Sequence, residues 1–136
     1  MSASAVSLLG YIGWILLLSA LLVSARMITS FTKGNALNSF SQDGSDLPGW
    51  GARVTRAHGN SLEWFAIPAA LILYGMVTGQ SEITNGLAMI SLYCRLGQSI
   101  SHMISTAVPV VLVRATFFTV QLVIWGMWAW NFFNAG

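Results

Sequence analysis

The side chains best suited to chemistry form a polar stripe at the start of one long apolar segment. The stripe consists of Arg53, Arg56, Asn60 and Glu63, with Trp64 at its border. Spacings of three and four place these residues on one narrow face of a helix. Arginine binds the paired oxygens of carboxylates and phosphates, while Glu63 and Asn60 can receive an ammonium or amide group. The stripe therefore indicates a site for a small anionic or zwitterionic molecule.

A second polar stripe lies further along the chain, and Arg26 and Arg114 are predicted at a similar depth in two other segments. Charges inside membrane spans are costly, so a layer of them is a functional candidate. His58 points away from the first stripe and needs another polar partner, which a second subunit would supply. The second stripe consists of Arg95, Gln98, Ser99 and His102.

Composition excludes a soluble protein. Apolar residues make up 55% of the chain and charged residues only 7%, whereas about a quarter of a soluble domain is charged. A single cysteine, Cys94, rules out a disulfide framework and a multi-cysteine metal site, and we predict no bound metal. The six Lys and Arg are scattered without a basic run, so nothing favours nucleic-acid binding.

Four segments are apolar and long enough to cross a bilayer, which requires about 20 residues each. Together they predict one domain over residues 1–136, an all-α bundle of four transmembrane helices in contact with membrane lipids. The polar segment from Thr29 to Gly51 is predicted as a loop. We expect the aromatic residues between Trp125 and Phe133 to form an interfacial belt. The predicted spans are about 6–26, 52–79, 82–107 and 109–133.

The distribution of basic residues predicts how the bundle is oriented. Arg26, Lys33, Arg53 and Arg56 flank the first loop, and Arg114 follows the short third connection. The second connection and both termini carry no Lys or Arg. Because basic residues collect on the cytoplasmic side, we expect loops one and three in the cytoplasm and both termini opposite.

The segment from Arg53 to Glu63 resembles the signature of the MAPEG family (membrane-associated proteins in eicosanoid and glutathione metabolism). That signature reads Arg-x-x-Arg-Ala-His/Gln-x-Asn-x-x-Glu at the start of the second helix. The preceding Leu47-Pro48-Gly49-Trp50 looks like the bacterial branch, which suggests a bacterial inner membrane. The resemblance spans the whole chain, including an arginine in the third helix and one that opens the fourth.

The resemblance implies a homotrimer that binds glutathione between neighbouring subunits near the cytoplasmic side. It implies contacts from Arg56, Asn60 and Glu63 of one subunit, and from Arg26 and His58 of its neighbour. The same glutathione site would include Trp64, Arg95, Gln98 and His102.

Arg114 resembles the family arginine that stabilises the thiolate of glutathione. A free thiol has a pKa of about 8.5, and a nearby fixed positive charge lowers it. The resemblance therefore implies a glutathione transferase or peroxidase with Arg114 as the catalytic residue. The second substrate would be a lipophilic small molecule at the lipid-facing mouth.

Three positions depart from the family pattern. Trp64 and His102 stand where catalytic members often carry tyrosine, and Gln98 stands where tyrosine or histidine is usual. These departures favour an alternative, a non-catalytic structural or accessory membrane subunit with the same fold. Glu63 can also act as a structural ion-pair partner of Arg53 or Arg56. An ion or proton pathway is weaker, because the charges occupy one leaflet and do not cross.

Overall fold

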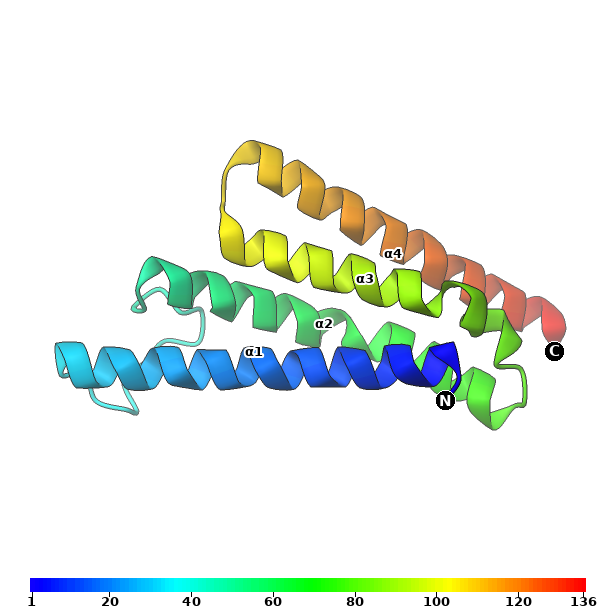
Figure 1. Cartoon of the computed structure of the whole chain (residues 1–136), viewed down its shortest axis with the longest axis horizontal. Coiled ribbons are helices and arrows are strands. Elements are labelled where there is room, and N and C mark those ends of the chain that lie inside the picture. Colours follow the sequence, from blue (N-terminus) through cyan, green and yellow to red (C-terminus); the bar gives the residue numbers. More distant parts are fainter.

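Four helices make up most of the chain in the computed structural model, which describes residues 1–136. They are α1 (Ala3–Lys33), α2 (Gly49–Val77), α3 (Glu82–Ile104) and α4 (Val108–Ala135). Consecutive helices run in opposite directions, so both termini lie at one end of the molecule and the α1–α2 and α3–α4 connections at the other (Figure 1). The predicted all-α four-helix bundle is confirmed.

The apolar character of the helices explains the membrane fold. α1, α2 and α4 are each long and apolar enough to cross a bilayer, whereas α3 does not meet that criterion. The polar side chains of α3, including Arg95 and Gln98, are buried in the bundle rather than turned toward lipid. Its 23 residues span about 34 Å, which matches a hydrocarbon core of about 30 Å. α3 is therefore long enough to cross the membrane, and its polar face is covered by its neighbours.

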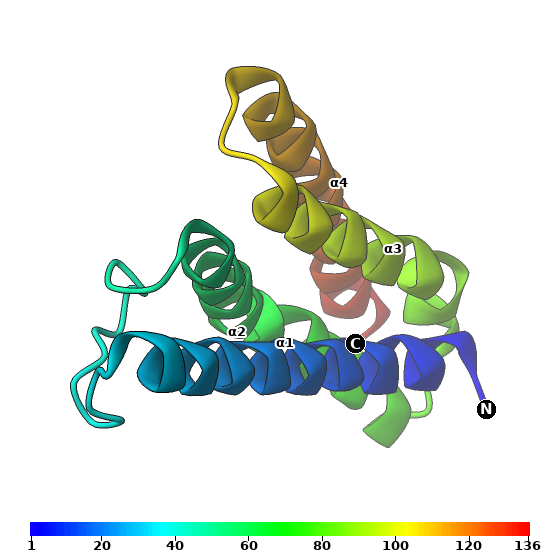
Figure 2. The ribbon, with the colours of Figure 1, turned by 60° about the vertical axis from the view of Figure 1, so that its left-hand side comes forward.

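α3 is the central helix of the bundle. It packs against α1, α2 and α4, while α1 and α4 do not touch each other. Figure 2 shows α3 lying between α1 and α4. Residues of α3 can therefore reach all three other helices, which is what allows one buried side chain to connect the whole fold.

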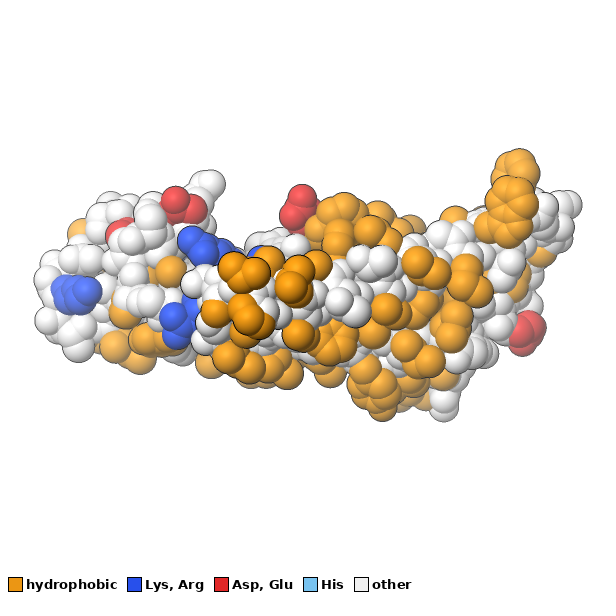
Figure 3. Space-filling model, turned by 90° about the horizontal axis from the view of Figure 1, so that it is seen from above, with side chains coloured by type: hydrophobic (Ala, Val, Ile, Leu, Met, Phe, Trp, Pro, Cys, Tyr) orange, Lys and Arg blue, Asp and Glu red, His pale blue; other side chains and the backbone are white.

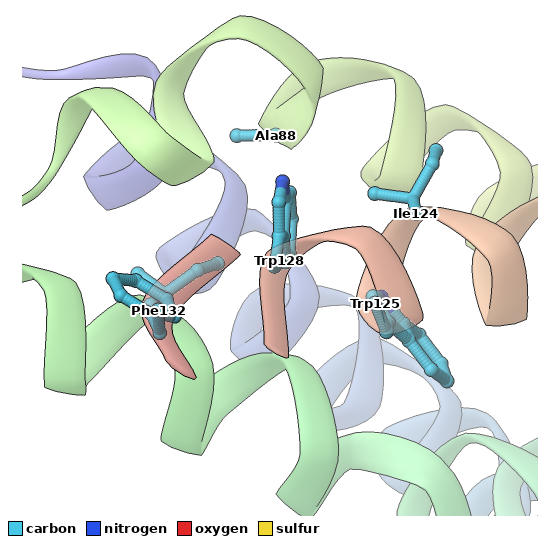
Figure 4. Packing of buried hydrophobic residues seen from close by; sticks show 6 residues of the cluster. Ala88, Ile124, Trp125, Trp128 and Phe132 are labelled. Atoms are coloured by element: carbon cyan, nitrogen blue, oxygen red, sulfur yellow. The ribbon is translucent and has the colours of Figure 1, made fainter. Parts of the chain in front are cut away.

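The largest apolar core lies in the half of the bundle that contains the termini. Figure 4 shows Trp128 and Ile124 of α4 beside Ala88 of α3, with Phe132 one turn further along α4. Gly75 of α2 permits the close approach of Phe132, because a Cβ there would lie 2.9 Å from its ring. The predicted aromatic belt is therefore wrong for Trp125, Trp128 and Phe132, which are buried core residues. Trp130 and Phe133 remain exposed.

The first loop is shorter than predicted. α1 continues seven residues beyond Arg26 and ends at Gly34, whose φ of 70° is the left-handed conformation that glycine adopts easily. Within these extra turns the hydroxyls of Thr29 and Thr32 donate to the carbonyls of Ala25 and Ile28. The loop then folds back onto the bundle, where Leu47 packs with Leu22, Ala25 and Val54. This packing fixes the entry into α2 and hence its polar stripe.

Candidate functional site

The basic side chains gather at one end of the molecule. On the face shown in Figure 3 the Lys and Arg side chains lie in the left half, toward the α1–α2 loop, and hydrophobic side chains are spread over the middle and right. Arg53 and Arg56 lie in the first turns of α2, Arg26 near the end of α1, and Arg114 near the start of α4. The candidate site is therefore a cationic layer at the end that holds the first and third connections.

Arg95 is the buried centre of this layer. Its side chain is 1% exposed, and Nη1 donates to Oδ1 of Asn60 at 2.8 Å. Its guanidinium carbon lies 5.3 Å from the ring centre of Tyr11 on α1 and 6.0 Å from that of Trp125 on α4. Such contacts with aromatic faces stabilise a desolvated cation. Arg95 thus contacts all three other helices, while its Nε and Nη2 are buried and have no partner in the chain.

A row of amide side chains extends from Asn60 across the bundle. Gln98 donates from Nε2 to Oδ1 of Asn60 at 3.1 Å, and Gln121 of α4 donates from Nε2 to Oε1 of Gln98 at 2.8 Å. The same Gln121 nitrogen donates to the carbonyl of Phe117 at 3.0 Å. Sequence reasoning missed Gln121, although it is the one amide side chain between Arg114 and Asn131 of α4. In the single chain Arg95 and Gln98 are enclosed and donate to Asn60, and their predicted contact with a ligand stays a prediction.

Arg53 and Arg26 differ in how they are held. Nε of Arg53 donates to the carbonyl of Met103 at 2.7 Å. That carbonyl is among the last four of α3, which have no partner within the helix. Arg53 therefore fastens the start of α2 to the end of α3. Arg26 is half-buried, and its Nε is buried without a partner in the chain.

His58 finds its partner within its own chain. Its Nε2 lies 2.9 Å from Oγ of Ser19 on α1, and Ser19 donates its hydroxyl hydrogen to the carbonyl of Ile15. Ser19 must therefore accept from His58. His58 does point away from the stripe toward α1, as its position predicts, but it needs no second subunit to satisfy Nε2.

His102 and Arg114 form the other contact between predicted site residues. Nη1 of Arg114 lies 3.2 Å from Nδ1 of His102, which joins the last turn of α3 to the second turn of α4. Both side chains are half-buried. Nε2 of His102 is buried and has no partner. The pair therefore retains one unused N–H donor.

The remaining predicted residues lie at the surface of the single chain. Arg56 and Glu63 are exposed, and neither belongs to the buried network of Arg95. Trp64 is half-buried, with its ring 4.8 Å from that of Phe118 on α4 in an edge-on arrangement. The structure thus brings Asn60 together with Arg95 and Gln98, and His102 together with Arg114. No group of three or more His, Cys, Asp or Glu side chains is placed to hold a metal ion.

Fold and site together define an integral membrane four-helix bundle with a cationic layer at one end. The sequence profile of the MAPEG family matches residues 4–133 of the chain, and the protein therefore belongs to the MAPEG family. No curated protein and no solved structure gives a significant match. Membership connects the chain with glutathione-related transferase or peroxidase roles and with accessory roles in the same family.

Proposed function

We propose that this protein is a glutathione-dependent membrane transferase or peroxidase that acts on lipophilic electrophiles. The observation that carries the proposal is the imbalance of charge in the polar layer. Five arginines belong to that layer, whereas Glu63 is the only carboxylate on the helices at that end. Unpaired guanidinium groups are costly at membrane depth. An anionic ligand supplies the negative charge that the chain itself lacks.

Glutathione fits the side chains that remain free. It carries two carboxylates, one ammonium and a thiol. Exposed Arg56 binds a carboxylate, Glu63 binds the ammonium, and Trp64 borders the site. In a homotrimer, Arg26 and His58 of the partner subunit reach the same molecule. Arg95 and Gln98 contribute by holding Asn60 rather than by touching the ligand.

Arg114 is the proposed catalytic residue, and it acts on the thiol of glutathione. A fixed guanidinium beside the sulfur lowers the pKa of that thiol and raises the fraction of thiolate at neutral pH. In the transferase reaction the thiol proton passes to water and the sulfur bonds to the electrophilic carbon. The leaving group departs with its electron pair. In the peroxidase reaction two glutathione molecules are oxidised to the disulfide, while the hydroperoxide is reduced to an alcohol and water.

An apolar pocket at the junction of α3 and α4 is the proposed place of the second substrate. It has a volume of about 260 Å³ and lies where the end of α3 meets the start of α4. Ser101 and Val113, which line it, are the sequence neighbours of His102 and Arg114. A lipophilic molecule can enter from the bilayer and meet the thiolate there. The pocket is lined by Ser101, Ile104, Pro109, Val110 and Val113.

The deciding experiment measures glutathione binding to the purified protein in detergent, together with the ultraviolet absorbance of bound thiolate. We expect binding with a thiolate signal at neutral pH, and turnover with an aryl halide or an organic hydroperoxide. S-methylglutathione, which lacks a free thiol, is the matched control and should bind without the signal. Arg114→Ala should reduce the signal and turnover more than it reduces binding, because Arg56 and the partner subunit's Arg26 still hold the carboxylates.

The second candidate function is a non-catalytic accessory subunit of the same fold. The satisfied contacts within the chain favour it, since Oδ1 of Asn60 is occupied by Arg95 and Gln98, and Trp64 packs on Phe118. Glutathione that binds without any thiolate signal would support this reading. Arg114→Ala would then lower the stability of the assembly and leave the state of the thiol unchanged.

We also propose a location in a bacterial inner membrane, with the α1–α2 and α3–α4 connections in the cytoplasm. The concentration of basic side chains at that end supports this orientation. The cationic layer would then open toward the compartment that supplies glutathione.

A further inference from the structure

In the row of amide side chains that begins at Asn60, chemistry alone determines which end of each amide donates and which end accepts. An arginine side chain can donate hydrogen bonds but cannot accept them. Because Nη1 of Arg95 lies 2.8 Å from the amide of Asn60, the atom facing it must be the oxygen, Oδ1. The usual ambiguity between the nitrogen and oxygen of an amide is therefore absent at this position.

The same argument fixes the orientation of the Gln98 and Gln121 amides. Gln98 must present its nitrogen to Oδ1 of Asn60, so its oxygen faces Gln121. Gln121 must then present its nitrogen, whose other hydrogen meets the backbone carbonyl of Phe117, which can only accept. A donor-only group at one end and an acceptor-only group at the other thus fix all three amides. Gln98 is 3% exposed and Gln121 0%, so water does not compete for these bonds.

The fixed orientation of the row determines which atom of the Asn60 amide remains free. A carbonyl oxygen has two lone pairs, and Arg95 and Gln98 occupy both. The other end of the amide, Nδ2, donates to no group in the chain. Nδ2 is also absent from the buried polar atoms that lack a partner, so it is open to the surface. It lies on the stripe of α2 between Arg56 and Glu63, where the ligand is proposed to bind.

We infer that the amide row makes Asn60 a donor-only position that selects an oxygen acceptor of the ligand and rejects its ammonium group. This inference rests on the proposed function and corrects the expectation that Asn60 receives an ammonium. Gln98 and Gln121 are positioning residues, since they act on the ligand through Asn60. Glu63 is left as the acceptor for the ammonium. The site therefore requires a carboxylate or carbonyl oxygen at Asn60 and a cationic amine about one helical turn away, at Glu63.

The test uses Asn60→Asp, which changes only the outward end of the side chain. The inward oxygen remains and gains a charge-assisted bond to Arg95, so the variant should melt at or above the temperature of the unmodified protein. The outward donor becomes an acceptor that repels a ligand oxygen. We expect affinity for glutathione to fall on the order of tenfold to a hundredfold, as for a lost hydrogen bond to a charged group. Unchanged or tighter binding would overturn the inference.

A deaminated glutathione, which lacks the ammonium, separates the role of Asn60 from that of Glu63. Asn60→Asp should weaken the binding of both ligands, whereas Glu63→Gln should weaken glutathione and spare the deaminated analogue. Loss confined to glutathione in Asn60→Asp would place the ammonium at Asn60 and overturn the inference. Asn85→Asp is the matched control. Asn85 lies at the other end of α3, and its Oδ1 accepts from the backbone nitrogen of Ser4. That variant should leave both affinities unchanged.

The inference and the proposed function fail in different ways. If the unmodified protein binds no glutathione, the proposed function falls. The melting temperatures of variants then test the amide row without any ligand. Asn60→Leu is the variant that removes the inward oxygen. An Asn60→Asp variant that melts below Asn60→Leu would show that Oδ1 does not face Arg95, and it would overturn the inference without any ligand.

Discussion

Nδ1 of His102 lies 3.2 Å from Nη1 of Arg114, across the connection between α3 and α4. Because arginine can only donate, Nδ1 must carry a lone pair, and the imidazole is neutral with its proton on Nε2. Nε2 is buried and has no partner in the chain. His102 therefore does two things that a purely apolar residue would not do. It holds the guanidinium of Arg114 in place and keeps one N–H donor available beside it.

This contact predicts that His102 positions Arg114. His102→Leu should remove the anchor of the guanidinium and reduce the thiolate absorbance of bound glutathione several-fold, while affinity for glutathione changes less. His102→Gln retains an oxygen that accepts from Arg114 and should restore most of the signal. The measurement is the thiolate absorbance per mole of bound glutathione. An equal signal in His102→Leu and the unmodified protein would show that Arg114 does not depend on His102.

The sequence predicted the fold because the signals for it are local. Apolar segments of spanning length and the stripe that starts at Arg53 follow from residue type and spacing alone. The predicted loop was too long, since polar residues such as Thr29 and Thr32 belong to α1, which continues to Lys33 and is capped by Gly34. The aromatic residues of α4 were misplaced for a related reason. Composition indicates that aromatic residues near a helix end favour the membrane interface. Which of them are buried depends on packing against residues such as Ala88 and Ile72.

The sequence indicated which helix faces carry the polar residues of the layer, but not how these residues connect. Helical phase places Asn60 and Arg95 on inward faces, yet it does not show that one oxygen accepts from two donors. Gln121 is distant in sequence from both, and its role depends on how α4 packs against α3. For His58 the predicted direction was correct, but the predicted partner was not. Ser19 of the same chain supplies the partner that we expected from a second subunit.

We predict that the α1–α2 and α2–α3 connections lie on opposite sides of the membrane. Single cysteines at exposed Gln42 and Thr78 are introduced after Cys94→Ala, and an impermeant thiol reagent is applied to cells and to inverted vesicles. Gln42→Cys should react only in inverted vesicles, and Thr78→Cys only in intact cells. Labelling of both positions from one side would contradict the antiparallel arrangement across the bilayer. The reverse pattern would instead contradict the orientation.

A homotrimer remains a prediction, and its support in the structure is the exposure of charge. Arg56 and Glu63 are exposed on α2, on a helix that also exposes Leu62 and Ile67. Charged side chains at membrane depth normally face protein or water rather than lipid. Native mass measurement in mild detergent should therefore show three copies. A preparation that stays monomeric and still binds glutathione would argue that these charges are satisfied without a neighbour.

The contact between α3 and α4 should be sensitive to one methyl group at Gly97. A Cβ at Gly97 would lie 2.7 Å from the ring of Phe117, so the ring or the helix must move. Overpacking of this kind costs about 1–3 kcal/mol, against about 1 kcal/mol gained from replacing glycine in a helix. If the ring of Phe117 is held in place by α3, Gly97→Ala should lower the melting temperature in detergent, and an unchanged melting temperature would show that the ring moves aside. Gly86→Ala is the matched control on α3, since nothing lies within 4 Å of its Cβ, and it should be neutral or stabilising.

The α1–α2 loop provides a prediction about pH. The carboxylate of Asp43 accepts from the backbone nitrogen of Ser45 at 3.0 Å and from the hydroxyl of Ser41 at 2.8 Å. These bonds lower the pKa of Asp43 from 3.8 to about 2. Bonds from Ser41 also lower the pKa of Asp46. A carboxyl group with a lowered folded-state pKa stabilises the folded loop fully above its unfolded pKa, and this stabilisation is lost as pH falls toward the folded value.

Loop order should therefore be constant at neutral pH and decline between about pH 4 and pH 2. Hydrogen exchange of residues 39–47 in detergent measures it directly. Asp43→Asn should speed exchange at neutral pH and flatten the acid dependence, because the substituted amide carries no charge to be neutralised. The neighbouring Asn38→Ala, at an exposed position in the same loop, should leave the profile intact. Since the loop carries Leu47 into the core with Leu22 and Val54, faster exchange should extend to the first turn of α2. If faster exchange is confined to the loop, the packing of Leu47 does not couple the order of the loop to the start of α2, where the stripe begins at Arg53.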